Sequence, residues 1–109
     1  MSEAVALGLR AHSGWTAAVA VAGSPTKPIV VERRRIETAD LRIAGSKQPY
    51  HAAKELSGKT AETLICQCRE SSTLLAIGAV NALVTQLRQN GFIVVAAGIL
   101  LASGPPLTL

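Results

Sequence analysis

The stretch FIVVAAGILL, residues 92–101, decides the fold. It is a continuous apolar run without a charged side chain, and it follows Arg88 and Gly91, which together are typical of the end of a helix. A run of this kind is typical of a parallel-type strand that is buried on both faces of a sheet. We therefore expect a central strand here, reached from a helix and returning into the sheet beside and parallel to the first strand.

Working outward to the N-terminus, two strands are expected at residues 5–11 and 15–21. Both runs are rich in Val and Ala, and the segment HSG separates them. Gly14 in that segment can adopt the positive φ that a tight hairpin needs. The two runs are therefore predicted to pair as antiparallel strands.

A third strand is expected at residues 29–36, after the turn-forming segment 23–28. By the two-residue period of a strand, Arg33 and Arg35 share one face, while Arg34 lies on the other. The second half of this strand is therefore expected at a solvated edge of the sheet.

The chain from Pro49 to Arg88 is predicted to be helical. Residues 38–48 are polar, and Pro49 is expected in the first turn of a helix. Ser57-Gly58 marks a point at which the helical segment can divide into two. The stretch 74–84 is apolar nearly all round and is expected to be covered on more than one side. Apolar and small residues recur at helical spacing: Leu56, Thr60, Leu64, Cys68, Leu75, Ala79 and Leu83.

These elements predict a mixed α/β (α+β) domain in the order β-β-β-α-β. It contains a three-stranded antiparallel meander, a long and divisible helix, and a buried strand parallel to the first. With 109 residues, 49% hydrophobic and 17% charged, the chain forms one domain, residues 1–109, and disorder is excluded. Because the segment PPLTL follows the buried strand with no second helix, we expect either a partner subunit on the free apolar face or a polypeptide that continues.

The order of elements resembles the first half of the ribonuclease H-like and actin-like fold, with GLRAHSGWT, residues 8–16, at its first hairpin. A nuclease of that class would need clustered carboxylates for its metal ions, but the first strand carries Leu7, Leu9 and Arg10. An actin-like phosphate hairpin would also carry an acid, so the match of Gly14 and Thr16 to it is loose. We therefore favour a tight turn at this hairpin and expect no nuclease chemistry.

Three short blocks are similar to a family of uncharacterised bacterial proteins. They are ALGLRAHSGW at residues 6–15, RRRIE at 33–37 and QPYHAA at 48–53. The resemblance implies no particular activity. It implies a chain that continues past the buried strand into another helix.

A candidate pocket is suggested by the rare residue types, because the chain has one Trp, one Tyr and two His, and they fall in two clusters. If the hairpin tip lies near the start of the helix, imidazoles and aromatic faces line one pocket. The alternative that we favour makes the aromatic residues part of the core or its rim and the histidines caps of backbone groups. The candidate residues are His12, Ser13, Trp15, Tyr50 and His51.

A candidate anion-binding site is the run Arg33, Arg34 and Arg35, since the net charge of +4 permits an anionic partner. Strand alternation splits the run between two faces, and no aromatic residues interleave with it for base stacking. A solvated edge strand is therefore the favoured interpretation, and nucleic acid is not expected as a partner. Cys66 and Cys68 cannot form a zinc site alone, so no metal and no cofactor are expected.

The sequence favours a non-catalytic ligand-binding or protein-interaction module that acts as a homodimer. The alternatives are a small enzyme that uses His12 or His51, and a weak nucleic-acid or phosphate binder that uses Arg33–Arg35. Cysteines two residues apart and the lack of a basic, apolar leader favour a cytoplasmic protein. Gly and Pro residues interrupt the uncharged stretch 89–109, so no membrane span is expected.

Overall fold

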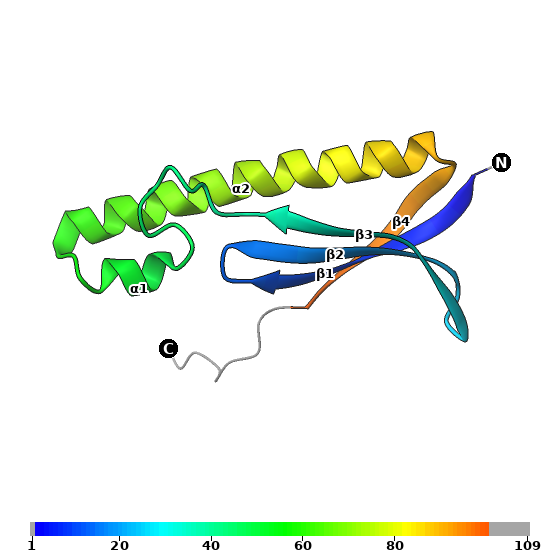
Figure 1. Cartoon of the computed structure of the whole chain (residues 1–109), viewed down its shortest axis with the longest axis horizontal. Helices are drawn as coiled ribbons and strands as arrows, with labels where there is room; N and C mark the ends of the chain where they lie inside the picture. Colours follow the sequence, from blue (N-terminus) through cyan, green and yellow to red (C-terminus); the bar gives the residue numbers. More distant parts are fainter. Residues whose placement is uncertain (1, 101–109) are drawn as a thin grey trace.

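The computed structural model describes residues 2–100, which form a four-stranded sheet with a long helix along one face (Figure 1). The predicted meander, the helix and the returning parallel strand are confirmed. The elements are β1 Glu3–His12, β2 Trp15–Ser24, β3 Lys27–Glu37, α1 Pro49–Ala53, α2 Gly58–Gln89 and β4 Phe92–Leu100.

The strands lie in the order β3-β2-β1-β4, with β1 antiparallel to β2, β2 antiparallel to β3, and β1 parallel to β4. The hairpin between β1 and β2 closes with His12 paired to Trp15. Register shifts interrupt the ladder between Val5 and Ala6 on β1 and between Ala20 and Val21 on β2. The strand order places two strands at the edges of the sheet, β3 on one side and β4 on the other.

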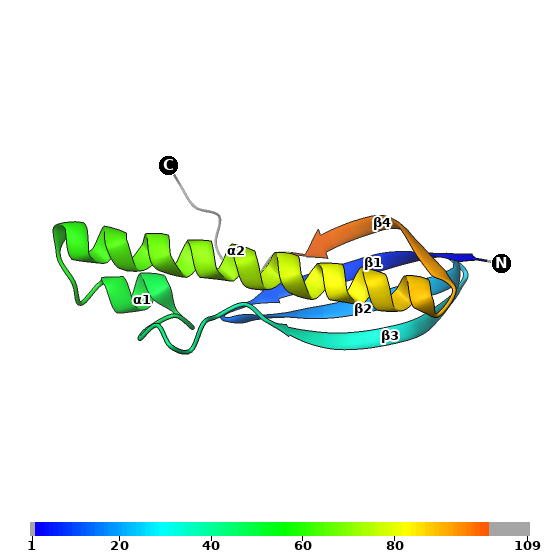
Figure 2. The same ribbon diagram turned by 90° about the horizontal axis from the view of Figure 1, so that it is seen from above.

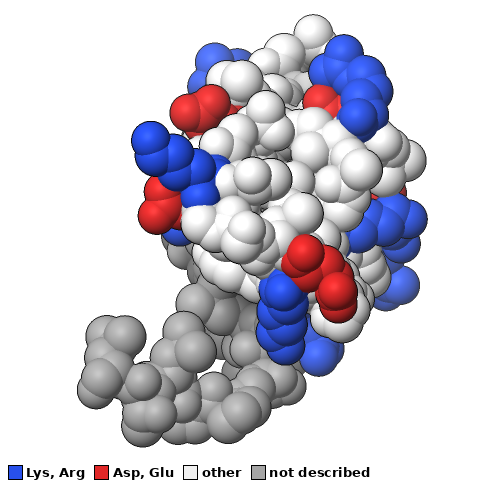
Figure 3. Space-filling model, turned by 90° about the vertical axis from the view of Figure 1, so that its left-hand side faces the viewer, with Lys and Arg blue, Asp and Glu red and all other residues white. Residues whose placement is uncertain are grey.

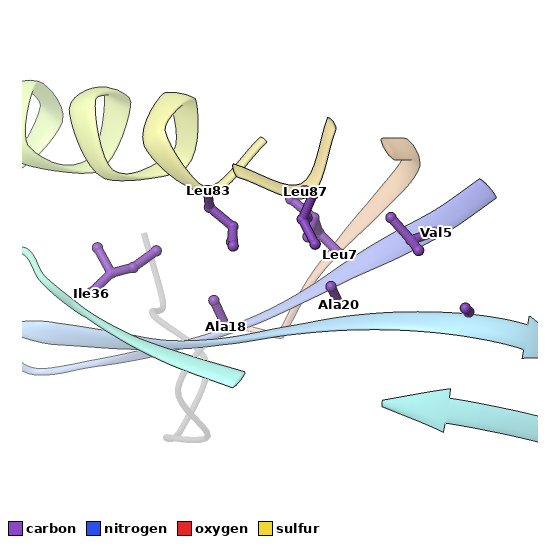
Figure 4. Close-up of a cluster of buried hydrophobic side chains, with 8 residues drawn as sticks. Val5, Leu7, Ala18, Ala20, Ile36, Leu83 and Leu87 are labelled. Atoms are coloured by element: carbon purple, nitrogen blue, oxygen red, sulfur yellow. The ribbon is translucent and has the colours of Figure 1, made fainter. Parts of the chain in front are cut away.

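The core lies between α2 and the sheet, where Leu83 and Leu87 are 1% and 2% exposed (Figure 4). Their side chains point at alternate residues of the strands, because every second residue of a strand faces the helix. Burying a leucine in this way contributes about 1.5–3 kcal/mol to folding. The strand residues of this core cluster are Val5, Leu7, Ala18, Ala20, Ala22 and Ile36.

The helical segment divides at the predicted point, since α1 ends at Ala53 and Ser57, in an extended conformation, precedes the first turn of α2. The predicted stop is also confirmed, because the backbone N–H groups of Asn90 and Gly91 bond the last carbonyls of α2 and Gly91 has a φ of 87°. A helix of 32 residues spans about 48 Å and a strand of 10 residues about 33 Å. The helix therefore extends past the sheet and lies over α1 (Figure 2).

The prediction that residues 92–101 form a central strand buried on both faces is wrong for the described part, which ends at Leu100. Within residues 2–100, β4 pairs with β1 alone. Phe92 and Val94 pack against the core, but β4 is exposed from Val95 onward. The physical reason is that α2 covers only the start of β4 before the strand diverges from it (Figure 1).

The prediction that residues 74–84 are covered on more than one side is also wrong within this chain. Leu74 is 72% exposed and Ile77 is exposed as well, while Leu83 is buried. One face of α2 meets the sheet, and the opposite face meets no other element in the part of the chain that the structure describes. Apolar surface is thus left uncovered on α2 and on β4.

Candidate functional site

A pocket of about 610 Å³ lies where α2 extends past the sheet. Its walls come from the tip of the β1–β2 hairpin, the end of β3, the segment before α1, α1 itself and one face of α2. This volume is in the range of pockets that bind small molecules. The lining residues are His12, Ser13, Gly14, Thr38, Ser46, Lys47, Gln48, Pro49, Tyr50, His51, Ile65, Cys68, Arg69, Ser72 and Thr73.

The hairpin tip is fixed against the loop that follows β3. Gly14 adopts a φ of 82°, and its carbonyl oxygen accepts a hydrogen bond of 3.0 Å from the backbone N–H of Thr38. A Cβ atom on Gly14 would lie 3.4 Å from the Cα atom of Lys47. The positive φ favours glycine, and the contact brings His12 and Ser13 to the segment before α1.

The segment before α1 is held by a second glycine, Gly45, at a φ of 80°. A Cβ atom there would lie 2.6 Å from the Cβ of Ala52, so a larger residue would push α1 away. The carbonyl of Gly45 accepts a hydrogen bond of 3.2 Å from the backbone N–H of Gln48. Pro49 then begins α1, as predicted, and places Tyr50 and His51 in the pocket wall.

The remaining wall is one face of α2, where lining residues recur at intervals of three and four: Ile65, Cys68, Arg69, Ser72 and Thr73. The Tyr50 hydroxyl beside the Arg69 guanidinium raises the pKa of that side chain. Burial raises the pKa of the Cys68 thiol, so this cysteine stays protonated at neutral pH. The Thr73 hydroxyl donates a hydrogen bond of 2.9 Å to the carbonyl of Arg69.

The charge of the pocket wall is one-sided. The lining residues include the cations Lys47 and Arg69 and the imidazoles of His12 and His51. No Asp or Glu is among them. The carboxylates that precede this region are engaged elsewhere: Glu37 pairs with Arg35 at 2.5 Å and Asp40 with Arg42 at 2.8 Å. Seen from this end of the molecule, blue and red side chains lie around an uncharged centre (Figure 3).

The predicted clustering of His12, Ser13, Tyr50 and His51 is therefore observed, but Trp15 is not among the lining residues. Its ring stacks on the His12 imidazole, with centroids 4.0 Å apart and planes 5° apart. The Arg35 guanidinium lies 4.2 Å from the centre of the Trp15 ring. Since β1 and β3 flank β2, Trp15 is held between side chains of its two neighbouring strands, on the sheet face that α2 does not cover.

The arginine run splits between two faces, as predicted. Arg34 lies on the helix side, where its guanidinium donates to the Gln86 side chain of α2 and pairs with Glu32 at 4.0 Å. Arg33 and Arg35 are exposed on the opposite face. A continuous three-arginine patch is thus absent from the described strand β3.

A second hollow, of about 640 Å³, lies on the sheet face that α2 leaves free. Its wall includes Arg10 and Arg33 and the apolar end of β4, with Ile99 and Leu100. Gly8 and Gly98 pair across β1 and β4 and line the hollow. Because glycine has no side chain, these two positions leave its space unfilled. This hollow joins the exposed part of β4 to the arginine-bearing strand.

The sequence does not predict four of the wall residues, Lys47, Arg69, Ser72 and Thr73. The signal for the α2 residues is their spacing, which places them on one helix face, but only the three-dimensional position of α2 shows that this face meets the hairpin tip. Lys47 stands in a polar loop, and its approach to Gly14 has no local sequence signal.

A scan against protein-family models and searches among curated proteins and solved structures find no match to the chain. Among residues 2–100, no three His, Cys, Asp or Glu side chains are grouped so that they could hold a metal ion. None of the helices described has the length and the apolar character that a membrane crossing requires.

Proposed function

We propose that the domain is a non-catalytic interaction module that acts as a homodimer, joined through the outer edge of β4. The observation that carries this proposal is the exposed apolar surface of that strand. Val95, Ile99 and Leu100 are each more than 60% exposed, and Ile93 is 43% exposed. Monomeric proteins rarely leave a strand of this composition open to water.

The outer edge of β4 lacks the two commonest protections of an edge strand, although a register shift leaves Val95 of β4 without a partner on β1. Edge strands are usually protected by charged residues or proline, and the segment FIVVAAGIL contains neither. Its outer backbone N–H and C=O groups meet no partner within the described residues. They would gain hydrogen bonds from another strand, and the apolar side chains would leave water at the same time.

A second copy of the chain supplies a matching edge. Two β4 strands can pair antiparallel about a two-fold axis, because each presents the same uncharged edge and closed symmetry is the commonest arrangement of oligomers. The two sheets then form one continuous sheet, and like charges do not meet at the junction. The pairing would cover Val95 and place it near the partner's β4.

The pocket with both histidines keeps a small enzyme as the second candidate function. Two observations favour a non-catalytic role. First, no carboxylate lines the pocket to orient an imidazole. Second, the His12 imidazole stacks on Trp15, and neither histidine side chain makes a hydrogen bond in the described region.

The strand order β3-β2-β1-β4, with β1 parallel to β4, supports a ribonuclease H-like half-domain as the fold in this proposal. Free Cys66 and Cys68 support the cytoplasm as its location. The family of bacterial proteins suggested by the three sequence blocks stays a prediction. These statements concern setting and location, and the dimer is testable without them.

The test is the particle mass in solution, measured by sedimentation equilibrium over a range of protein concentrations. The wild-type chain is expected to have twice the mass of one chain. Val95→Lys, which places a charge in the β4 edge, is expected to be a folded monomer. The matched control is Val30→Lys on β3, where the side chain is 45% exposed in the structure. It is expected to remain a dimer.

A wild-type monomer at every concentration would overturn the proposal. So would equal weakening by Val95→Lys and Val30→Lys, because the effect would then follow from added charge rather than from the β4 edge. Far-UV circular dichroism of each variant shows that the sheet and helix are retained.

A further inference from the structure

We infer that the pocket between the hairpin tip and α2 binds a small phosphate monoester, whose phosphoryl group is held by Lys47 and Arg69. This inference concerns a different part of the molecule from the proposed dimer, because no residue of β4 lines the pocket. The juxtaposition that carries it is a lysine from a loop and an arginine from α2 facing one cavity without a carboxylate.

The first argument is charge. Lys47 and Arg69 form no ion pair within residues 2–100, although the ion pairs there take up Arg34, Arg35 and Arg42. Two cations that line one cavity without a carboxylate partner repel each other, and an anion between them removes that repulsion. Lysine and arginine are the side chains that most often hold phosphate groups.

The second argument is the number of hydrogen-bond donors. Hydroxyl groups of Ser13, Ser46 and Ser72 line the same cavity, together with the His12 and His51 imidazoles. A phosphoryl group has three oxygen atoms that accept hydrogen bonds in different directions, and donors from several walls match that shape. A carboxylate needs only one arginine to be satisfied in two parallel bonds. The donor set therefore fits a phosphoryl group better.

The third argument is size. A cavity of about 610 Å³ holds more than one phosphate ion, so an organic group can accompany the phosphoryl group. Pro49, Tyr50 and Ile65 supply apolar surface in the wall for such a group. Inorganic phosphate is therefore expected to bind more weakly than a phosphate monoester with a small sugar.

The chain carries its own reporter for this site. Trp15 is the one tryptophan of the sequence, and its ring stacks on the His12 imidazole with the ring centroids 4.0 Å apart. His12 is also one of the residues that line the pocket. A ligand that reaches the His12 imidazole changes the environment of the indole ring. Fluorescence of Trp15 is therefore expected to change as the pocket fills.

The experiment titrates the full chain with ribose 5-phosphate and follows Trp15 fluorescence and the melting temperature, because a ligand that binds the folded state raises the apparent stability. Ribose is the uncharged control, and inorganic phosphate tests the phosphoryl group alone. Arg69→Gln is compared with Arg88→Gln, the same change at the far end of the same helix. Lys47→Gln is compared with Lys54→Gln.

Saturable binding of ribose 5-phosphate is expected, with weaker binding of phosphate and none of ribose. Arg69→Gln and Lys47→Gln are each expected to weaken binding about tenfold or more, since each removes a charged hydrogen bond to the ligand. Arg88→Gln and Lys54→Gln are expected to bind as the wild type does.

The inference would be overturned by no saturable binding, by equal binding of ribose and ribose 5-phosphate, or by equal effects of the pocket variants and their controls. If binding is lost in Arg33→Gln instead, the phosphate contacts the hollow on the free sheet face and the assignment to the pocket is wrong. If Arg69→Gln fails to fold by circular dichroism, Lys47→Gln decides the matter, because Lys47 lies in an exposed loop.

Discussion

The two edges of the sheet differ in charge and in proline content, two properties that govern strand pairing. The β3 edge carries charges of both signs and a proline within KPIVVERRRIE, whereas the β4 edge, FIVVAAGIL, carries neither. Both edges are open in the structure. Water solvates the charged side chains of the β3 edge well, but it solvates the apolar side chains of the β4 edge poorly. This difference indicates that the β4 edge takes a partner.

The two edges also use their inward side chains differently. On β3, Ile36 enters the core and Arg34 contacts Gln86, so this strand is fastened to α2 by both apolar and polar contacts. On β4, Phe92 and Val94 reach the core, but the rest of the strand diverges from α2. From Val95 onward, β4 therefore carries the apolar side chains that are typical of a buried strand, although it lies exposed at the edge of the sheet.

The largest expected effect comes from a substitution in the core between α2 and the sheet, because both edge strands pack against this core. Leu83→Ala leaves a cavity between α2 and the sheet, where the leucine is 1% exposed, and is expected to lower the free energy of unfolding by about 2–5 kcal/mol. Urea denaturation followed by circular dichroism measures the change. Leu74→Ala on the exposed face of α2 is the matched control, with an expected change within about 0.5 kcal/mol. Similar losses in the two variants would contradict the described core.

A smaller effect is expected when the β3 edge is made to resemble the β4 edge. The double substitution Arg33→Val and Arg35→Val removes the charges from one face of β3, so this edge becomes able to pair as well. With two pairing edges the chain is expected to form assemblies heavier than a dimer, which sedimentation velocity would detect. A double variant that sediments as the wild type does would show that charge on β3 is not what keeps that edge free.

The smallest effect is expected from the surface ion pairs of β3. Glu37→Gln removes the pair with Arg35, whose two side chains are more than half exposed, and is expected to change the free energy of unfolding by about 0.5 kcal/mol or less. Urea denaturation at low and high salt measures the change, and a loss of several kcal/mol would mean that the pair is part of the structural support of β3.

Most of the fold could be predicted from local signals. Gly14 indicated the hairpin, Pro49 the first turn of α1, and Ser57-Gly58 the division of the helical segment. The position of residues 92–100 in the order of strands was predicted as well, but their burial was not. A continuous apolar run shows that a strand needs cover, and it does not show whether the same chain provides that cover.

The site was predictable in part for the same reason. The two clusters of rare residues indicated a pocket with His12 and His51, because hairpin tips and helix starts can meet. Trp15 is a candidate for the pocket, with a rim position favoured, and its ring lies beside the pocket, between His12 and Arg35. The contributions of Lys47 and Arg69 depend on how far α2 extends past the sheet, which a distance along the sequence does not give.

The most direct test of the difference between the two edges is hydrogen exchange of backbone amides, measured residue by residue on the wild-type chain at high and low protein concentration. In an edge strand, the N–H groups that face away from the sheet exchange fast unless a partner strand binds them. The outward N–H groups of β4 are expected to become protected at high concentration, while those of β3 exchange fast at both. Outward N–H groups of β4 that exchange as fast as those of β3 at every concentration would contradict the account.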